Sequence, residues 1–183
     1  MQRVPGSPSR ADLERARGKS IPDVIAPGLD VLFVGINPSL WSGAVGHHFA
    51  RPGNRFWRAL HEAGFTDRLL FPHEGEALLK QRIGITNLVN RATASADELD
   101  TADFRAGARR IAAKVRRYGP KVVAFVGIGA YRAAFGRARA RVGRQEEPLG
   151  GATIWVLPNP SGRTAGYQMP ALSRAFRDLR CSL

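Results

Sequence analysis

The sequence contains a single cysteine, Cys181, among 183 residues. One cysteine cannot form an internal disulfide bond or ligate an iron–sulfur cluster, and no CxxC pair or His/Cys cluster has the spacing of a zinc site. Two of the four histidines are adjacent and two are isolated, so all four are interpreted as non-ligands: His47, His48, His61 and His73. We therefore expect neither a metal nor any other cofactor.

Acidic residues are scarce, with 15 Asp and Glu against 28 Lys and Arg, which gives a formal net charge of +13. A domain with this imbalance repels itself, and a polyanionic partner relieves the repulsion. Only four of the basic residues are lysines, and arginine is the better side chain for bidentate contacts to phosphates and base edges. A GC-rich genome explains the arginine excess equally well, but not the net charge. The charge indicates nucleic acid, an anionic membrane surface or a ribosome-like assembly as partner.

Long apolar runs are also missing. No stretch of 18 apolar residues occurs, so no membrane span is predicted. The first residues are polar and lack the basic start and apolar segment of a secretory signal. We expect a cytoplasmic protein at the bacterial nucleoid, acting as a monomer.

The chain length suits one domain with a real hydrophobic core. Residues 1–29 are punctuated by proline and glycine and are interpreted as a flexible basic tail, with a short helix over Ala11–Arg17. Such a tail adds phosphate affinity without sequence preference, or it is a disordered end without a role. Residues 30–183 are expected to form the single folded domain.

Strand and helix patterns alternate along that domain. Short apolar runs predict strands over residues 30–35, 84–89, 121–127 and 153–157, and helical spacing predicts helices over 54–64, 72–82, 103–118, 131–135 and 170–179. Residues 136–151 are interpreted as a basic loop. Strands separated by helices are typical of the α/β class, here a three-layer α/β/α sandwich with a four-stranded, mostly parallel sheet.

Three segments follow strand ends, where ligands bind in open α/β sheets. They are residues 35–39 (GINPS), 87–93 (NLVNRAT) and 158–164 (PNPSGRT). Amides, small hydroxyls and glycines in such loops cradle phosphates, orient a water or hold a planar polar base. Each segment alone is also an ordinary turn signal; their common placement favours a functional site.

Two other kinds of site find little support. Gly127 and Gly129 follow a strand, but the third glycine of the dinucleotide fingerprint is replaced by Arg132. The serines in the strand-end loops have no evident His and Asp partners for a hydrolase triad.

Four blocks of the sequence resemble the mismatch-specific uracil-DNA glycosylase and thymine-DNA glycosylase family, which is family 2 of the uracil-DNA glycosylase superfamily. They are residues 35–40 (GINPSL), 46–57 (GHHFARPGNRFW), 84–93 (GITNLVNRAT) and 159–162 (NPSG), in the family's order and spacing. The resemblance covers about residues 22–179. It implies the uracil-DNA glycosylase fold and extrusion of the target nucleotide from the duplex.

The resemblance also implies roles in base excision. Asn37 would position the attacking water, and backbone N–H groups around Ile36 and Phe49 would stabilise the departing uracil anion. The Phe49 ring would stack on the flipped base; its alternative is a core aromatic. Gly35 would face the base, and Ser42 would line the pocket near the base C5 position.

The last block would contact DNA. Asn159, Ser161, Gly162 and Thr164 are the candidates for contacts with DNA, and Arg163 stands where bacterial relatives carry a bulky apolar wedge. Arginine can fill the gap left by the flipped base and hydrogen-bond to the orphaned guanine. Asn159 occupies the place of a histidine in the classical uracil glycosylases, which predicts slower chemistry.

Asp97 is a second catalytic candidate, because a carboxylate near the pocket could act as a base or stabilise a cationic sugar. Its alternative is a helix N-cap. No lysine lies in any of the blocks, so hydrolysis without strand cleavage is expected.

The sequence thus predicts a monofunctional DNA repair glycosylase that removes uracil, best opposite guanine, from double-stranded DNA. Two other interpretations stay open: a nucleosidase acting on free nucleosides, and a non-catalytic DNA-binding protein of the same fold.

Overall fold

A computed structural model describes residues 7–162 and 166–183. Its centre is a sheet with strand order β2-β1-β3-β5-β4. Four strands run parallel: β1 (Val31–Gly35), β2 (Ile83–Asn87), β3 (Val122–Val126) and β5 (Thr153–Leu157). These confirm the four predicted strands. A two-residue strand, β4 (Gly143–Arg144), pairs antiparallel with β5 inside the segment interpreted as a loop, and a Gly-Arg pair carries no apolar signal that would have revealed it.

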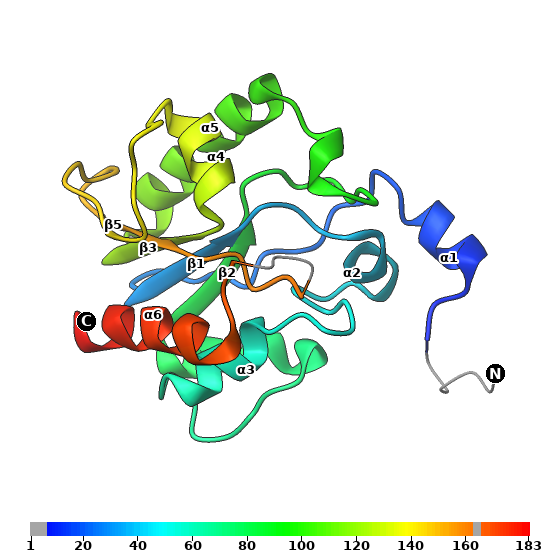
Figure 1. Cartoon of the computed structure of the whole chain (residues 1–183), viewed down its shortest axis with the longest axis horizontal. Helices are drawn as coiled ribbons and strands as arrows, with labels where there is room; N and C mark the ends of the chain where they lie inside the picture. The colour runs from blue at the N-terminus through cyan, green and yellow to red at the C-terminus, as the bar shows by residue number, and fades with distance from the viewer. Residues whose placement is uncertain (1–6, 163–165) are drawn as a thin grey trace.

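Helices cover both faces of the sheet, as predicted. Figure 1 shows α3 (Phe56–Glu62) and α6 (Met169–Cys181) on one side, and α4 (Thr101–Tyr118) and α5 (Ile128–Phe135) on the other. All five residues of β1, β2 and β3 are buried, as two-sided coverage requires. Alternation along β1 sends Phe33 toward one helical layer and Val34 toward the other. No helix in the described part of the chain is long and apolar enough to span a membrane.

Local capping explains where the helices begin and end. Asp100 caps α4 in a capping box with Asp103, and Gly119 ends it with φ of 58°. Residues 72–82 were predicted as a helix and form a 3₁₀ helix, η1 (Pro72–Gln81). The short helix α2 (Leu40–Val45), capped by Ser39, was not predicted, because its buried residues are Ser42 and Gly43 rather than apolar side chains at helical spacing.

The first 29 residues differ from their prediction. A short helix, α1 (Arg10–Arg15), lies within the expected region, but the segment after it is packed: Ala16, Ile21 and Leu29 are at most 2% exposed. Val24 pairs with Ile85 through two backbone hydrogen bonds of 2.9 and 2.8 Å. The expectation of a tail did not anticipate this packing, because the prolines and glycines that suggested a tail mark turns between packed residues. Residues 1–6 lie outside the described residues.

Candidate active site

A cavity of about 460 Å³ opens at the carboxyl ends of the parallel strands. All three strand-end segments contribute to its wall, each with an asparagine: Asn37 after β1, Asn87 at the end of β2, and Asn159 after β5. Seven of the predicted site residues line it: Ile36, Asn37, Ser42, Phe49, Asp97, Asn159 and Ser161. The predicted convergence of these segments is thus present in the structure.

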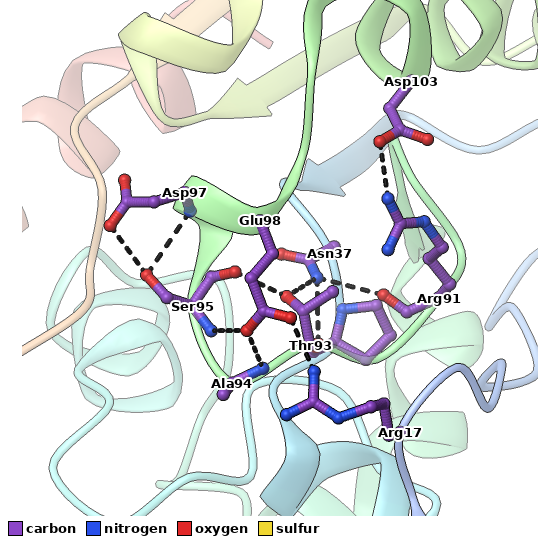
Figure 2. Close-up of polar contacts among 10 residues, drawn as sticks. Arg17, Asn37, Arg91, Thr93, Ala94, Ser95, Asp97, Glu98 and Asp103 are labelled. Atoms are coloured by element: carbon purple, nitrogen blue, oxygen red, sulfur yellow. Dashed lines mark hydrogen bonds and ion pairs between the residues drawn. The ribbon is translucent and has the colours of Figure 1, made fainter.

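The amide of Asn37 is held in one orientation. Its Nδ2 lies 2.7 Å from Thr93 Oγ1, 3.0 Å from the Arg91 carbonyl and 3.1 Å from the Pro38 carbonyl (Figure 2). Thr93 Oγ1 in turn donates to the Ser95 carbonyl at 2.7 Å, so it must accept from Asn37. The nitrogen is fully used, and no donor among the described residues hydrogen-bonds to Oδ1. Asn37 therefore presents an acceptor to the cavity.

Phe49 has an unusual backbone and a well-supported ring. Its φ is 53°, in the left-handed region that residues other than glycine rarely adopt. The ring stacks on Phe56 with centroids 3.9 Å apart and an interplanar angle of 14°. A Cβ atom at Gly35 would lie 3.1 Å from Phe49 Cζ and 2.6 Å from Asn87 Oδ1. Glycine is therefore required at position 35 for the ring and the amide to approach β1 this closely.

Ser42 is buried and its hydroxyl is engaged within the protein. Its Oγ accepts from the backbone N–H of Ala50 at 3.1 Å and lies 3.2 Å from Ser39 Oγ. Ser42 thus joins α2 to the turn that carries Phe49, while also lining the cavity.

His48 and Asn87 form a buried pair on the cavity wall, and the sequence gave no indication that these two residues contact each other. His48 Nε2 lies 2.9 Å from the Pro22 carbonyl, and His48 Nδ1 lies 3.2 Å from Asn87 Nδ2. Burial lowers the pKa of the His48 ring below its ordinary value. The sequence indicated Asn87 only as the first residue of a segment that follows a strand; the structure places it at the end of a fully buried strand, in the position next to Gly35. His48 gave no such signal.

Asp97 lines the cavity but remains exposed to solvent. Its carboxylate accepts from Ser95 Oγ at 2.8 Å. The alternative of a helix N-cap is wrong, because Asp100 caps α4 and Ser95 caps the 3₁₀ turn η2 (Ala96–Glu98). Figure 2 shows how Thr93 and Ser95 connect Asn37 to Asp97 along one loop.

The segment after β5 is held in place by one arginine. Arg55 donates to the carbonyls of Pro160, Ser161 and Tyr167 at 3.2, 2.9 and 2.6 Å. Gly162 packs so closely that a Cβ atom there would lie 2.8 Å from the Gly53 carbonyl oxygen. The predicted DNA contacts Arg163 and Thr164 lie outside the described residues.

Metal-ligand chemistry finds no support in the described part of the chain, where no three His, Cys, Asp or Glu side chains gather as potential ligands. The polar groups of the cavity are mainly amides and hydroxyls. Such groups orient water and planar heterocycles without any cofactor.

We compared the sequence and the fold with those of known proteins. Residues 22–180 match the model of the uracil DNA glycosylase superfamily. The solution structure of a candidate uracil DNA glycosylase from Methanosarcina acetivorans superposes with a TM-score of 0.53 at 22% identity, covering 89% of this chain and 98% of that one. At this identity the second comparison shows a shared fold. The first spans most of the sequence, and the chain belongs to the uracil DNA glycosylase superfamily.

Proposed function

We propose that the protein is a monofunctional, mismatch-specific uracil-DNA glycosylase. It would flip uracil, best opposite guanine, out of double-stranded DNA and hydrolyse the N-glycosidic bond, leaving an abasic site. Superfamily membership supports a DNA glycosylase role in general. The observation that carries the finer proposal is the Asn37 amide, whose nitrogen is bound by the protein and whose oxygen faces a cavity that also presents an aromatic ring and a second amide.

Asn37 would position the water that attacks the sugar. Its Oδ1 can accept a hydrogen bond from water and so aim a lone pair of the water oxygen at C1′ of the flipped nucleotide. An amide is too weak a base to deprotonate water early in the reaction. Bond cleavage must therefore run ahead of attack, through an oxocarbenium-like sugar and a departing uracil anion, with the proton lost late.

Phe49 and Asn87 would hold the base. One face of the Phe49 ring stacks on Phe56, which holds the ring in place. The opposite face would stack on uracil. Asn87 offers both a carbonyl oxygen and an N–H, which match the N3–H and C4=O groups of uracil. Backbone N–H groups near Ile36 and Phe49 would stabilise the negative charge that develops on the base.

Contacts with DNA would come from Asn159, Ser161 and Gly162, with Arg163 entering the gap in the duplex and Thr164 beside it. Asn159 and Ser161 line the cavity, and phosphates flanking a flipped nucleotide would pass beside them. The net charge of +13 supplies the long-range attraction to the phosphate backbone.

Asp97 remains a second candidate for activating water, because it lines the same cavity. Asp97 is exposed to solvent, whereas three acceptors fix the Asn37 amide, so Asn37 is the better candidate for positioning the water. In this reading Asp97 would supply electrostatic stabilisation of the cationic sugar rather than act as the base.

The test is a base-release assay on labelled duplexes carrying U·G, U·A or T·G pairs, and on uracil in a single strand, without divalent metal and followed by alkaline cleavage of abasic sites. Asn37→Ala and Asp97→Asn would be compared with the wild type. Uracil release from U·G that is lost in Asn37→Ala supports the proposal. Loss mainly in Asp97→Asn moves the catalytic role to the carboxylate, and no release from any substrate overturns the enzyme and leaves a DNA-binding protein.

A nucleosidase acting on free nucleosides is the competing enzyme class. It would release uracil from free deoxyuridine at a rate comparable to that from duplex DNA. Its binding would also show no steep dependence on salt, since no row of phosphates is neutralised.

A further inference from the structure

The N-terminal segment reaches the base-binding cavity through a chain of three groups. The Pro22 carbonyl contacts His48 Nε2 at 2.9 Å, and His48 Nδ1 contacts Asn87 Nδ2 at 3.2 Å. His48 is 5% exposed and Asn87 is 6% exposed, so both contacts are largely shielded from bulk solvent. Ile21, the residue before Pro22, itself lines the cavity.

The chain has a fixed direction. A backbone carbonyl can only accept, so the His48 proton must sit on Nε2. A neutral ring protonated there has a lone pair on Nδ1 and can only accept from its other neighbour. Asn87 must therefore turn its NH₂ group toward His48 and its carbonyl oxygen away from it.

The position of that oxygen agrees with this deduction. Asn87 Oδ1 lies on the side of Gly35, where a Cβ atom would approach it to 2.6 Å, and the same imaginary atom would lie 3.1 Å from Phe49 Cζ. The carbonyl of Asn87 thus faces the part of the cavity beside the Phe49 ring. One N–H of the amide is used by His48, and the other remains for a ligand.

We propose that the Pro22 carbonyl and His48 are positioning groups that fix the direction of the Asn87 amide, and that this direction selects uracil over cytosine. The inference rests on the proposed function and extends it to base selectivity. Uracil presents a donor at N3 and an acceptor at C4, whereas cytosine presents an acceptor at N3 and a donor at C4. A freely rotating amide could match either edge; an amide locked by His48 matches only that of uracil. Thymine has the same edge, so this device does not separate it from uracil.

The protonation of His48 is measured first, in protein labelled with ¹⁵N on the histidine rings. The expected spectrum at pH 7 shows a neutral ring with its proton on Nε2. A proton on Nδ1, or a charged ring, would overturn the proposal. This measurement needs no activity, so it separates failure of the relay from failure of the glycosylase function.

Selectivity is measured in a second experiment, as binding to duplexes that carry 2′-fluoro-deoxyuridine or 2′-fluoro-deoxycytidine opposite guanine, since both resist cleavage. His48→Phe keeps a ring of similar size but offers no acceptor to Asn87. We expect its preference for uracil over cytosine to fall about tenfold, the worth of one oriented hydrogen bond. The cost of opening each base pair is the same for both proteins and cancels in the comparison.

His61→Phe is the matched control. His61 also contacts a backbone carbonyl, that of Thr66 at 3.0 Å, but it does not line the cavity. Its replacement is expected to leave the preference unchanged. A purely structural role of His48 would weaken binding of both duplexes equally, and an unchanged preference in His48→Phe would refute the relay.

Discussion

Thr93 fixes Asn37: its hydroxyl accepts from Asn37 Nδ2 at 2.7 Å and donates to the Ser95 carbonyl at 2.7 Å. Thr93 is 2% exposed, so the contact is shielded from water. The amide oxygen of Asn37 is held in the cavity because a neighbouring loop, not Asn37 itself, determines which end of the amide is free.

Thr93→Val should therefore slow catalysis without weakening substrate binding. The variant keeps the shape of the side chain but removes the nearest of the three acceptors, so the Arg91 and Pro38 carbonyls alone hold the Asn37 amide and its orientation is less firmly fixed. We expect kcat on U·G duplex to fall about tenfold, which corresponds to about 1.4 kcal/mol, with KM little changed. Single-turnover kinetics would separate the two parameters. Thr66→Val is the control, because the buried Thr66 hydroxyl has no hydrogen-bond partner among the described residues; equal losses in both variants would speak against the positioning role.

Replacing Phe49 by glycine should destabilise the protein less than replacing it by alanine. Its φ of 53° is costly for any residue with a Cβ atom, by about 1 kcal/mol relative to glycine. Phe49→Gly should therefore unfold at higher urea concentration than Phe49→Ala, although glycine normally destabilises. Both variants lose the ring stacked on Phe56 and should lose most of their activity. Equal midpoints for the two variants would show that the turn relaxes out of the left-handed region.

His48 should give stability a pH dependence just below neutrality. Burial lowers the His48 pKa below its ordinary value of 6.5, against smaller raising effects from the Pro22 carbonyl and Asp23, while Lys114 and His47 lower it further. The unfolded chain therefore binds the proton first, and the free energy of unfolding decreases as pH falls from about 6.5 through the lower, folded-state pKa. Above pH 6.5 this contribution is fully present and constant.

Urea unfolding of wild type and His48→Phe between pH 5 and 7.5 would measure that contribution. The difference between the two proteins should shrink as pH falls. The carboxylates with strongly lowered pKa values do not interfere, since Asp12 and Glu74 titrate near pH 2 in the folded state and below pH 5 when unfolded. A pH-independent difference would mean that His48 is not desolvated in solution.

Arg55→Lys should impair action on duplex DNA more than on a single strand. Arg55 joins the carbonyls of Pro160, Ser161 and Tyr167, and a lysine ammonium cannot reach three acceptors with the same geometry. We expect uracil release from U·G duplex to fall at least about tenfold, because the segment after β5 no longer holds its position against the DNA. The control is Arg58→Lys on α3, whose exposed pair with Glu62 is worth little. Equal losses on both substrates would assign Arg55 a role in overall stability instead.

Much of the scaffold followed from local patterns. The strands could be predicted from apolar runs, because helices cover them on both faces and their side chains are buried on both sides. The bounds of α4 could be predicted from its capping box and its terminal glycine. β4 was not predicted because two residues give no period to detect, and α2 was not predicted because it buries Ser42 and Gly43 rather than an apolar stripe. The packed N-terminal segment was not predicted either, since its buried residues Ala16, Ile21 and Leu29 follow no helical or strand spacing.

The residues of the candidate site also differ in how well the sequence predicts them. Asn37 and Phe49 lie in contiguous motifs, so their presence at the cavity could be predicted from the sequence. The relay from Pro22 to His48 to Asn87 joins three segments that are far apart in the chain, and only the folded structure brings them together. Asp97 was correctly placed at the cavity, but its exposure could not be read from its neighbours.

The pairing of Val24 with Ile85 has a consequence for behaviour at high concentration. β2 is the outermost strand of the sheet, and an uncovered outer strand is a template onto which a second chain can add. The two hydrogen bonds between Val24 and Ile85 occupy part of that edge, and the opposite edge ends in the two-residue β4 with Arg144. A protein shortened to begin near residue 30 would thus expose the outer edge of β2, and we expect it to aggregate more readily than the full chain.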